Sequence, residues 1–128
     1  MNRFALEIEV APEHLDQLLH VNNVQYLEWV QQVAREHWNT LTRPEWEADF
    51  AWVVRSHEIE YLKSAALGDR LRVETYVPEL RGPFSVRITE FTLPGADSRI
   101  ATCRTRWCLL KKPGFSPARI PDSIKAVF

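Results

Sequence analysis

The sequence predicts an α+β domain in which a single antiparallel sheet is covered on one face by one long helix. Residues 24–41 carry the one extended stretch of helical periodicity, four segments after residue 51 read as strands, and one alternating segment precedes the helix. The chain has 128 residues, of which 45% are hydrophobic, so it has the length of one domain and enough apolar side chains for a core. We therefore expect a single domain over residues 1–128.

The N-terminal part is predicted to hold one strand, one loop and the helix. Residues 3–10 alternate apolar and charged side chains until Pro12 ends the pattern, and the loop that follows has no periodicity. The helix has a wide apolar arc opposite a polar face, which indicates that other parts of the protein partly surround it. Asn22 and Asn23 are favoured N-cap residues directly before it. The apolar arc contains Val24, Tyr26, Leu27, Trp29, Val30, Val33, Ala34, Trp38 and Leu41.

The rest of the chain is predicted to be one short helical turn and a meander of long strands. Thr42 and Glu45, with Pro44 between them, favour a short additional turn capped at Thr42. Long strands of roughly ten residues would leave exposed edges in a monomer, and pairing two sheets edge to edge would cover one edge of each. We therefore expect a homodimer. The predicted strands cover residues 52–63, 70–77, 84–93 and 100–110.

Composition and charge exclude several classes of protein. The formal net charge is −1, so neither nucleic acid nor an anionic membrane surface is an expected partner. No apolar run approaches the roughly 20 residues that span a bilayer, and the N-terminus lacks a signal-peptide pattern. Cys103 and Cys108 point to opposite faces of one predicted strand, so we expect free thiols and a cytoplasmic protein. His14 and His37 have no partner at metal spacing, and no metal site is expected.

The loop before the helix holds the most reactive combination of side chains. Asp16 and His20 precede Asn22 and Asn23, so a carboxylate, an imidazole and two amides lie just before a helix N-terminus. Free N–H groups there carry partial positive charge and can polarise a carbonyl oxygen. An ionised Asp nearby can then act as nucleophile or as general base on water. A purely structural interpretation also fits: an Asn caps the helix, His20 is a polar loop residue and Asp16 is solvated.

The same loop resembles the signature of the hotdog-fold acyl-CoA thioesterases, the 4-hydroxybenzoyl-CoA thioesterase-like group that includes the plant acyl-ACP thioesterases. The resemblance is carried by Asp16, by His20-Val-Asn-Asn23 and by Tyr26-Leu-Glu-Trp29 at the helix start. It implies a long helix wrapped by a curved antiparallel sheet of about five strands, two subunits that share one continuous sheet, and active sites at the dimer interface. Weaker similarity lies in residues 55–61, 67–69 and 117–121 and in Trp107.

The resemblance assigns roles residue by residue. The catalytic carboxylate falls on Asp16, the histidine of the plant enzymes falls on His20, and the backbone donors fall near Asn23 and Val24. Basic side chains near the C-terminal turn, Arg119 among them, are candidates to anchor the phosphates of CoA. The predicted site therefore comprises Asp16, His20 and Asn23 for catalysis and Asn22, Val24, Tyr26, Trp29, Trp52 and Arg119 for substrate binding.

Three positions depart from the family pattern. Leu18 stands where the plant enzymes carry an Asn, and Leu18-Leu19 stands where many bacterial relatives carry a Gly. Gln32 replaces a helix acid that is common in relatives. The related hotdog hydratases are disfavoured, because their Asp and His are five apart with a Pro between, whereas Asp16 and His20 are four apart without one.

The expected activity is hydrolysis of an acyl-CoA to free acid and CoA by a homodimer or a dimer of dimers. CoA is then part of the substrate, and no separate cofactor is expected. A non-catalytic module that binds or senses acyl-CoA on the same fold is the alternative, because Leu18-Leu19 alters the loop, and a structural partner subunit is a third possibility. Aromatic, short-chain and long-chain acyl groups all stay open, as does a contribution from Glu58, Glu60 or His57 of a partner subunit.

Overall fold

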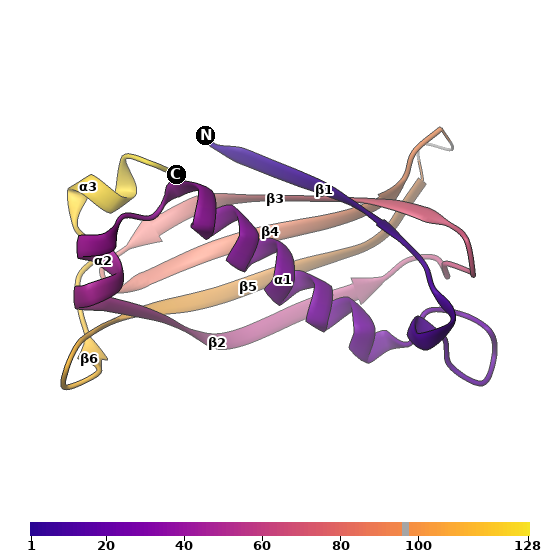
Figure 1. Cartoon of the computed structure of the whole chain (residues 1–128), viewed down its shortest axis with the longest axis horizontal. Helices are drawn as coiled ribbons and strands as arrows, with labels where there is room; N and C mark the ends of the chain where they lie inside the picture. Colours follow the sequence, from indigo (N-terminus) through magenta and orange to yellow (C-terminus); the bar gives the residue numbers. More distant parts are fainter. Residues whose placement is uncertain (96–97) are drawn as a thin grey trace.

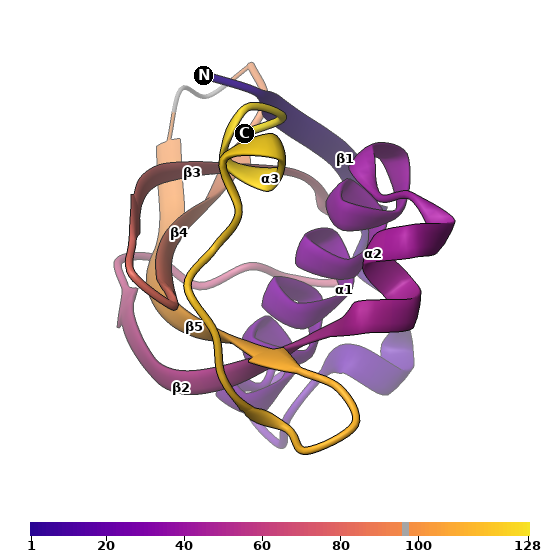
Figure 2. The ribbon, with the colours of Figure 1, turned by 90° about the vertical axis from the view of Figure 1, so that its left-hand side faces the viewer.

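A computed structural model describes residues 1–95 and 98–128, and it shows one long helix lying across a curled antiparallel sheet (Figure 1). Viewed from the end, the sheet wraps around the helix (Figure 2). The predicted α+β class is confirmed. The elements are β1 (Arg3–Glu9), η1 (Pro12–His14), α1 (Asn23–Leu41), α2 (Pro44–Asp49), β2 (Phe50–Tyr61), β3 (Arg70–Arg81), β4 (Phe84–Leu93), β5 (Ser98–Lys111), β6 (Ser116–Pro117) and α3 (Asp122–Lys125).

The order of strands in the sheet is β1-β3-β4-β5-β2, with the short β6 paired to β5. The predicted meander is correct for β3, β4 and β5, but it is wrong for β2, which pairs with β5 instead of β3. The position beside β3 is already occupied, because β1 pairs with β3 along its whole length from Arg3 to Glu9. The strand β2 therefore forms one edge of the sheet and β1 forms the other.

The N-termini of α1 and α2, the two α-helices before β2, are capped by Asn22 and Arg43. Asn22 caps α1, and its side-chain oxygen accepts the N–H of Val24 at 2.9 Å, as its residue type predicts. The cap of α2 is Arg43 with Pro44 in the first turn, so the expected cap at Thr42 is wrong. The Thr42 hydroxyl instead donates to the Glu47 carboxylate at 2.8 Å. Within the described residues, no helix is long and apolar enough to cross a membrane.

Two apolar clusters lie along α1. The first surrounds the N-terminal half of α1, where Tyr26, Trp29 and Phe91 are buried and their rings contact one another. The second lies at the other end of the sheet, where Trp46 and Leu109 pack with apolar residues of the C-terminal tail. Cys103 and Cys108 are both free and buried, which confirms the expected thiols.

The inward face of β4 is not its apolar face. Val86 and Ile88 alternate with Arg87 and Thr89, yet Arg87 and Thr89 are the residues that turn toward α1, and they are 4% and 0% exposed. Periodicity identifies the strand but not its orientation here, because the outer face is itself partly covered. The Phe84 ring on that face, for example, stacks under a guanidinium group.

Candidate active site

The loop between η1 and α1 is closed into a compact turn. Leu15 and Val21 form an antiparallel bridge at its base, and the Asp16 N–H donates to the His20 carbonyl at 2.8 Å. The Asp16 Oδ1 accepts the N–H of Leu18 at 2.8 Å and the N–H of His20 at 3.2 Å. Asp16 therefore holds the loop in shape, and the loop leads through Val21 and the cap residue Asn22 into α1.

Only one of the two Asp16 carboxylate oxygens takes part in this turn. Asp16 is half-buried, and its Oδ2 has no hydrogen-bond partner among the described residues. The structural and the chemical interpretations of Asp16 are thus compatible, because one oxygen orders the loop and the other remains able to accept a proton or attack a carbonyl carbon.

The double leucine leaves this arrangement intact. Leu18 and Leu19 are 75% and 70% exposed, so neither side chain enters the loop. Leu19 has a φ of 62°, which is a left-handed conformation that non-glycine residues rarely adopt. The family position where relatives carry Gly therefore keeps the turn here at the cost of backbone strain.

The start of α1 offers one free backbone donor. The Val24 N–H, which was a predicted donor to the substrate, is already donated to the Asn22 side chain. The Asn23 N–H is the first of the helix, and it has no acceptor among the residues that the structure describes. A helix of 19 residues carries partial positive charge at this end, so Asn23 is the better candidate to polarise a carbonyl oxygen.

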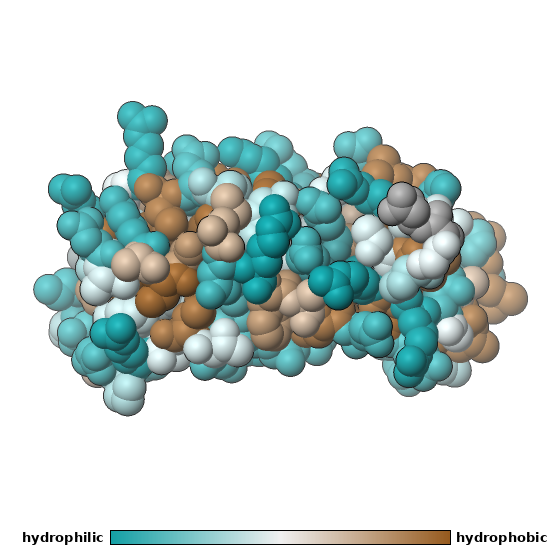
Figure 3. Space-filling view, turned by 90° about the horizontal axis from the view of Figure 1, so that it is seen from above, coloured by the Kyte–Doolittle hydropathy of each residue, from teal (hydrophilic) through white to brown (hydrophobic). Residues whose placement is uncertain are grey.

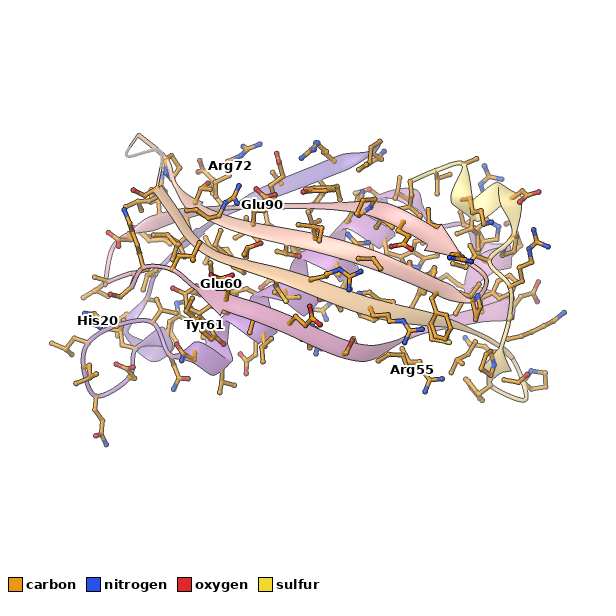
Figure 4. The ribbon with its side chains drawn as sticks, turned by 180° about the vertical axis from the view of Figure 1, so that it is seen from behind. His20, Arg55, Glu60, Tyr61, Arg72 and Glu90 are labelled. Carbon is orange, nitrogen blue, oxygen red and sulfur yellow. The ribbon has the colours of Figure 1, made fainter. Side chains whose placement is uncertain are left out.

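His20 and a residue that sequence reasoning missed, Tyr61, lie at this end of the molecule (Figure 4). The backbone of His20 pairs with Ala66, while its exposed imidazole has no hydrogen-bond partner in the described part of the chain. The Tyr61 hydroxyl donates to the Asn23 carbonyl at 3.0 Å and so ties the end of β2 to the first residue of α1. No local pattern marks this contact, because β2 and α1 meet only in the folded chain.

Tyr26 and Trp29 lie in the core and not along an open slot. They are 2% and 3% exposed and pack against Phe91, so the expectation that they line the acyl group is not met by an open surface in this chain. The Tyr26 hydroxyl is buried without a hydrogen-bond partner, and burial, with the nearby Tyr61 and Asp69, raises the pKa of Tyr26 to about 12. Tyr26 is therefore a neutral phenol at physiological pH.

Apolar side chains surround the loop on the outside. In the space-filling view, hydrophobic groups appear at the end of the molecule that carries the loop (Figure 3). The large apolar residues exposed near this end are Leu18, Leu19, Val24, Leu62 and Leu67.

Trp52 and Arg119 do not join the loop. Trp52 lies near the start of β2, and Arg119 lies in the tail beyond β6, whose partner is the end of β5. Both therefore lie toward the C-terminal end of α1, and Asp16 precedes its N-terminal end (Figure 1). Within one chain, the residues that the sequence predicts for the site form two groups at opposite ends of the helix.

The acidic and imidazole groups of β2 form no hydrogen bond with Asp16 in the described part of the chain. His57 faces the core, where its Nδ1 lies 2.8 Å from the Thr105 hydroxyl, and burial lowers its pKa. Glu58 and Glu60 are exposed on the same strand. Among residues 1–95 and 98–128, no group of three or more His, Cys, Asp or Glu side chains is placed to hold a metal ion.

Comparison with known proteins gives the class. A family model described as the thioesterase-like superfamily matches residues 10–128. The long-chain acyl-CoA thioesterase FadM of Escherichia coli (strain K12) is 29% identical over 89 residues, which are 68% of this chain and 67% of that protein. The chain belongs to the thioesterase-like superfamily.

Solved structures agree on the fold. The 1,4-dihydroxy-2-naphthoyl-CoA thioesterase Slr0204 from Synechocystis superposes with a TM-score of 0.85 at 18% identity, covering 98% of this chain and 95% of that chain. The protein SAV2348 from Staphylococcus aureus, solved in complex with CoA, superposes with a TM-score of 0.86 at 17% identity, covering 98% of this chain and 80% of that one. The curled sheet around one long helix is the hotdog fold, as the resemblance implies.

Proposed function

We propose that this protein hydrolyses acyl-CoA thioesters to a free carboxylic acid and CoA at the N-terminal end of α1. Membership of the thioesterase-like superfamily supports hydrolysis of a thioester. The observation that carries the position of the site is the Asp16 carboxylate, with one oxygen fixed by two backbone N–H groups and the other unpaired. This arrangement orders a carboxylate in the loop that leads into α1, whose N-terminus can stabilise developing negative charge.

In the proposed reaction, the Asn23 N–H and the dipole of α1 stabilise the negative charge that develops on the thioester oxygen. Asp16 acts in one of two ways. As a nucleophile, its Oδ2 bonds to the acyl carbon, the C–S bond breaks, CoA leaves as a thiolate that takes up a proton, and water then cleaves the anhydride. As a general base, Asp16 takes a proton from an attacking water and the proton passes to the leaving sulfur. His20, exposed beside Asp16, assists the proton transfer.

A homodimer would bring together the two groups of predicted residues. The strand β2 is an edge of the sheet, so its outer side is open to pairing. If β2 pairs antiparallel with β2 of a second copy, the end of β2 that carries Tyr61 approaches the end that carries Trp52 in the other subunit. Each Asp16 loop would then face the aromatic end of its partner. This supports a site shared between two subunits.

The acyl group is the open part of this proposal. The curated relative is named for long-chain acyl-CoA, and one structural neighbour is named for an aromatic acyl-CoA. Both would meet apolar surface around the loop. Release of free thiol from a panel of short-chain, long-chain and aromatic acyl-CoAs is the first measurement, and we expect a long-chain substrate to be cleaved fastest.

The role of Asp16 is tested with a pair of variants. Asp16→Asn keeps an oxygen that can accept the two loop N–H groups but removes the reactive carboxylate, so we expect a folded protein with a turnover at least about 100-fold lower. Asp16→Ala removes the loop contacts as well. Glu13→Gln, an exposed acid in the same segment, is the matched control and should keep full activity.

Two results would contradict the proposal. Full turnover by a folded Asp16→Asn variant would show that Asp16 has no chemical role. If the wild type binds acyl-CoAs by calorimetry but releases no thiol from any of them, the chain is a binding or sensing module on the same fold. A single turnover in ¹⁸O-water that leaves ¹⁸O in the Asp16 carboxylate would establish the nucleophilic route, because water that cleaves the anhydride at the Asp16 carbonyl carbon labels the enzyme, whereas the general-base route labels only the released acid.

A further inference from the structure

A cavity of about 330 Å³ lies at the C-terminal end of α1, away from the Asp16 loop. Its walls come from α1, α2, β2, β4, β5 and the C-terminus. The aromatic part of the wall is formed by Trp38, Phe50, Trp52, Trp107 and Phe128, and two inward residues of β4, Ser85 and Arg87, lie on its sheet side. The volume is within the range of small-ligand sites.

Arg87 is buried in this wall without a negatively charged partner. It is 4% exposed, and its Nη1 donates to the His37 Nδ1 at 2.8 Å and to the Thr75 hydroxyl at 3.1 Å. His37 accepts at Nδ1 and is therefore neutral, with its Nε2 donating to the Asn2 side chain at 2.8 Å. Among the described residues, no carboxylate lies within ion-pair distance of Arg87. A buried guanidinium with only neutral partners is costly.

The other charged groups on the wall do not offset Arg87. Arg35 and Lys112 add positive charge, and Lys112 donates to the backbone carbonyl of Glu47 at 2.8 Å. Glu47 is the one carboxylate on the wall among the described residues, and its Oε1 already accepts the Trp38 N–H and the Thr42 hydroxyl, both at 2.8 Å. The cavity therefore has an aromatic lining and an excess of positive charge.

Two further donors on the wall have no acceptor. The indole N–H groups of Trp52 and Trp107 are buried and have no hydrogen-bond partner among the described residues. Buried polar groups are ordinarily paired, so unpaired donors in the wall of a cavity indicate a ligand that brings acceptors. A ligand that fits this wall would carry a negative charge to pair with Arg87, acceptor oxygens for the two indole N–H groups, and an apolar body to pack against the aromatic rings.

We propose that this cavity binds a small carboxylic acid as its carboxylate, with the carboxylate on Arg87 and an apolar or aromatic body against the tryptophan rings. The planar guanidinium matches the geometry of a carboxylate. The choice of an acid rests on Arg87 and its surroundings and not on the proposed hydrolysis, although thioester hydrolysis releases acids of this class. Binding is measured without turnover, so the two proposals can fail separately.

The first test compares an acid with its uncharged amide of the same shape in the wild-type protein. Octanoate and benzoate are titrated against octanamide and benzamide, with heat and tryptophan fluorescence as readouts, since three tryptophans line the cavity. We expect each acid to bind about 10- to 100-fold more tightly than its amide, as charge-assisted hydrogen bonds in a buried site predict. Equal binding of acid and amide, or no binding of either acid, would overturn the proposal.

The second test moves from the ligand to the protein. Arg87→Gln should weaken octanoate binding at least about 10-fold and leave octanamide binding unchanged. Arg104→Gln, an exposed arginine opposite Ile88 on β5, is the matched control and should bind octanoate like the wild type. Unchanged octanoate binding by Arg87→Gln would contradict the assigned anchor.

One more variant keeps the test decisive if Arg87→Gln does not fold. Ser85→Leu narrows the cavity and leaves Arg87 in place, so it should weaken octanoate binding at least about 10-fold. Unchanged octanoate binding by Ser85→Leu would show that the ligand lies elsewhere and would overturn the cavity proposal.

Discussion

The two ends of α1 differ in where their polar and charged groups lie. At the N-terminal end, the helix is fully packed against the sheet through Tyr26, Trp29 and Phe91, and the reactive groups lie outside in a loop ordered by Asp16. At the C-terminal end, a cavity lies beside the second apolar cluster, and the charged group on its wall, Arg87, is buried. The comparison teaches that one helix can support both an exposed polar site, stabilised by backbone contacts, and a buried site whose donors await a ligand.

The largest expected effect is on the free energy of unfolding, and it follows from the difference in packing between the two ends of α1. Trp29→Ala should destabilise the protein by about 3–5 kcal/mol, because it empties a fully buried position. Trp52→Ala should cost only about 1–2 kcal/mol, because Trp52 is half-buried and already borders a cavity. Urea unfolding of the two variants measures both values. Equal losses would mean that the C-terminal end is packed as tightly as the other.

The second effect is a pH dependence that belongs to the C-terminal end. Burial, with the positive charge of Arg87, lowers the pKa of His37 from 6.5 to about 4. The unfolded chain therefore binds a proton at His37 near pH 6.5, whereas the folded chain binds it only near pH 4. The contribution of neutral His37 to the free energy of unfolding is complete above pH 6.5 and is lost as the pH falls toward 4. The loss amounts to about 2 kcal/mol between pH 7.5 and pH 5.

The measurement is the urea midpoint of the wild type and of His37→Gln across that pH range. We expect the variant to lack the His37 contribution, so its stability falls less on acidification. A His37→Gln profile parallel to that of the wild type would show that His37 is free to protonate in the fold.

The third effect concerns the cap of α1. Asn22→Ala removes the acceptor of the Val24 N–H, and we expect a loss of about 1 kcal/mol, visible as a lower Tm. Asn22→Ser restores a capping oxygen and should recover most of the loss. If Asn22→Ala is as stable as the wild type, the helix start is held mainly by the Tyr61 contact to Asn23.

The smallest effect is a gain in stability. Leu19 has a positive φ and an exposed side chain, so Leu19→Gly relieves strain without removing a packed group. We expect a gain of up to about 1 kcal/mol in the free energy of unfolding, measured by urea titration beside Leu18→Gly, whose φ is not in the left-handed region. A loss of stability on Leu19→Gly would show that the leucine side chain supports the loop.

Local pattern was sufficient for the elements but not for their neighbours. The helix predicted over 24–41 and the strand over 84–93 correspond to α1 and β4, because each pattern extends over many residues. The partner of β2 was predicted wrongly. Two helices precede β2 and a long connection follows it, so no local signal indicates its place in the sheet.

In the candidate site, too, local sequence predicted some features and missed those that depend on distant residues. Asp16 and His20 were identified because they lie in one short loop before a helix, where sequence proximity guarantees spatial proximity. The availability of each backbone donor was not predictable, since the Asn22 cap takes the Val24 N–H and leaves that of Asn23. No sequence pattern assigns a role to Arg87 or Tyr61, because their partners are distant in the sequence.

The sequence by itself determined the long helix and the long strands, the family resemblance and the loop that carries Asp16. These follow from residue type and short-range spacing, which the chain expresses before it folds. Only the tertiary structure decided which face of β4 turns inward, that the predicted residues form two groups, and that Arg87 is buried beside a hollow. Those features depend on which strands become neighbours, and that is set by the packing of the whole sheet around α1.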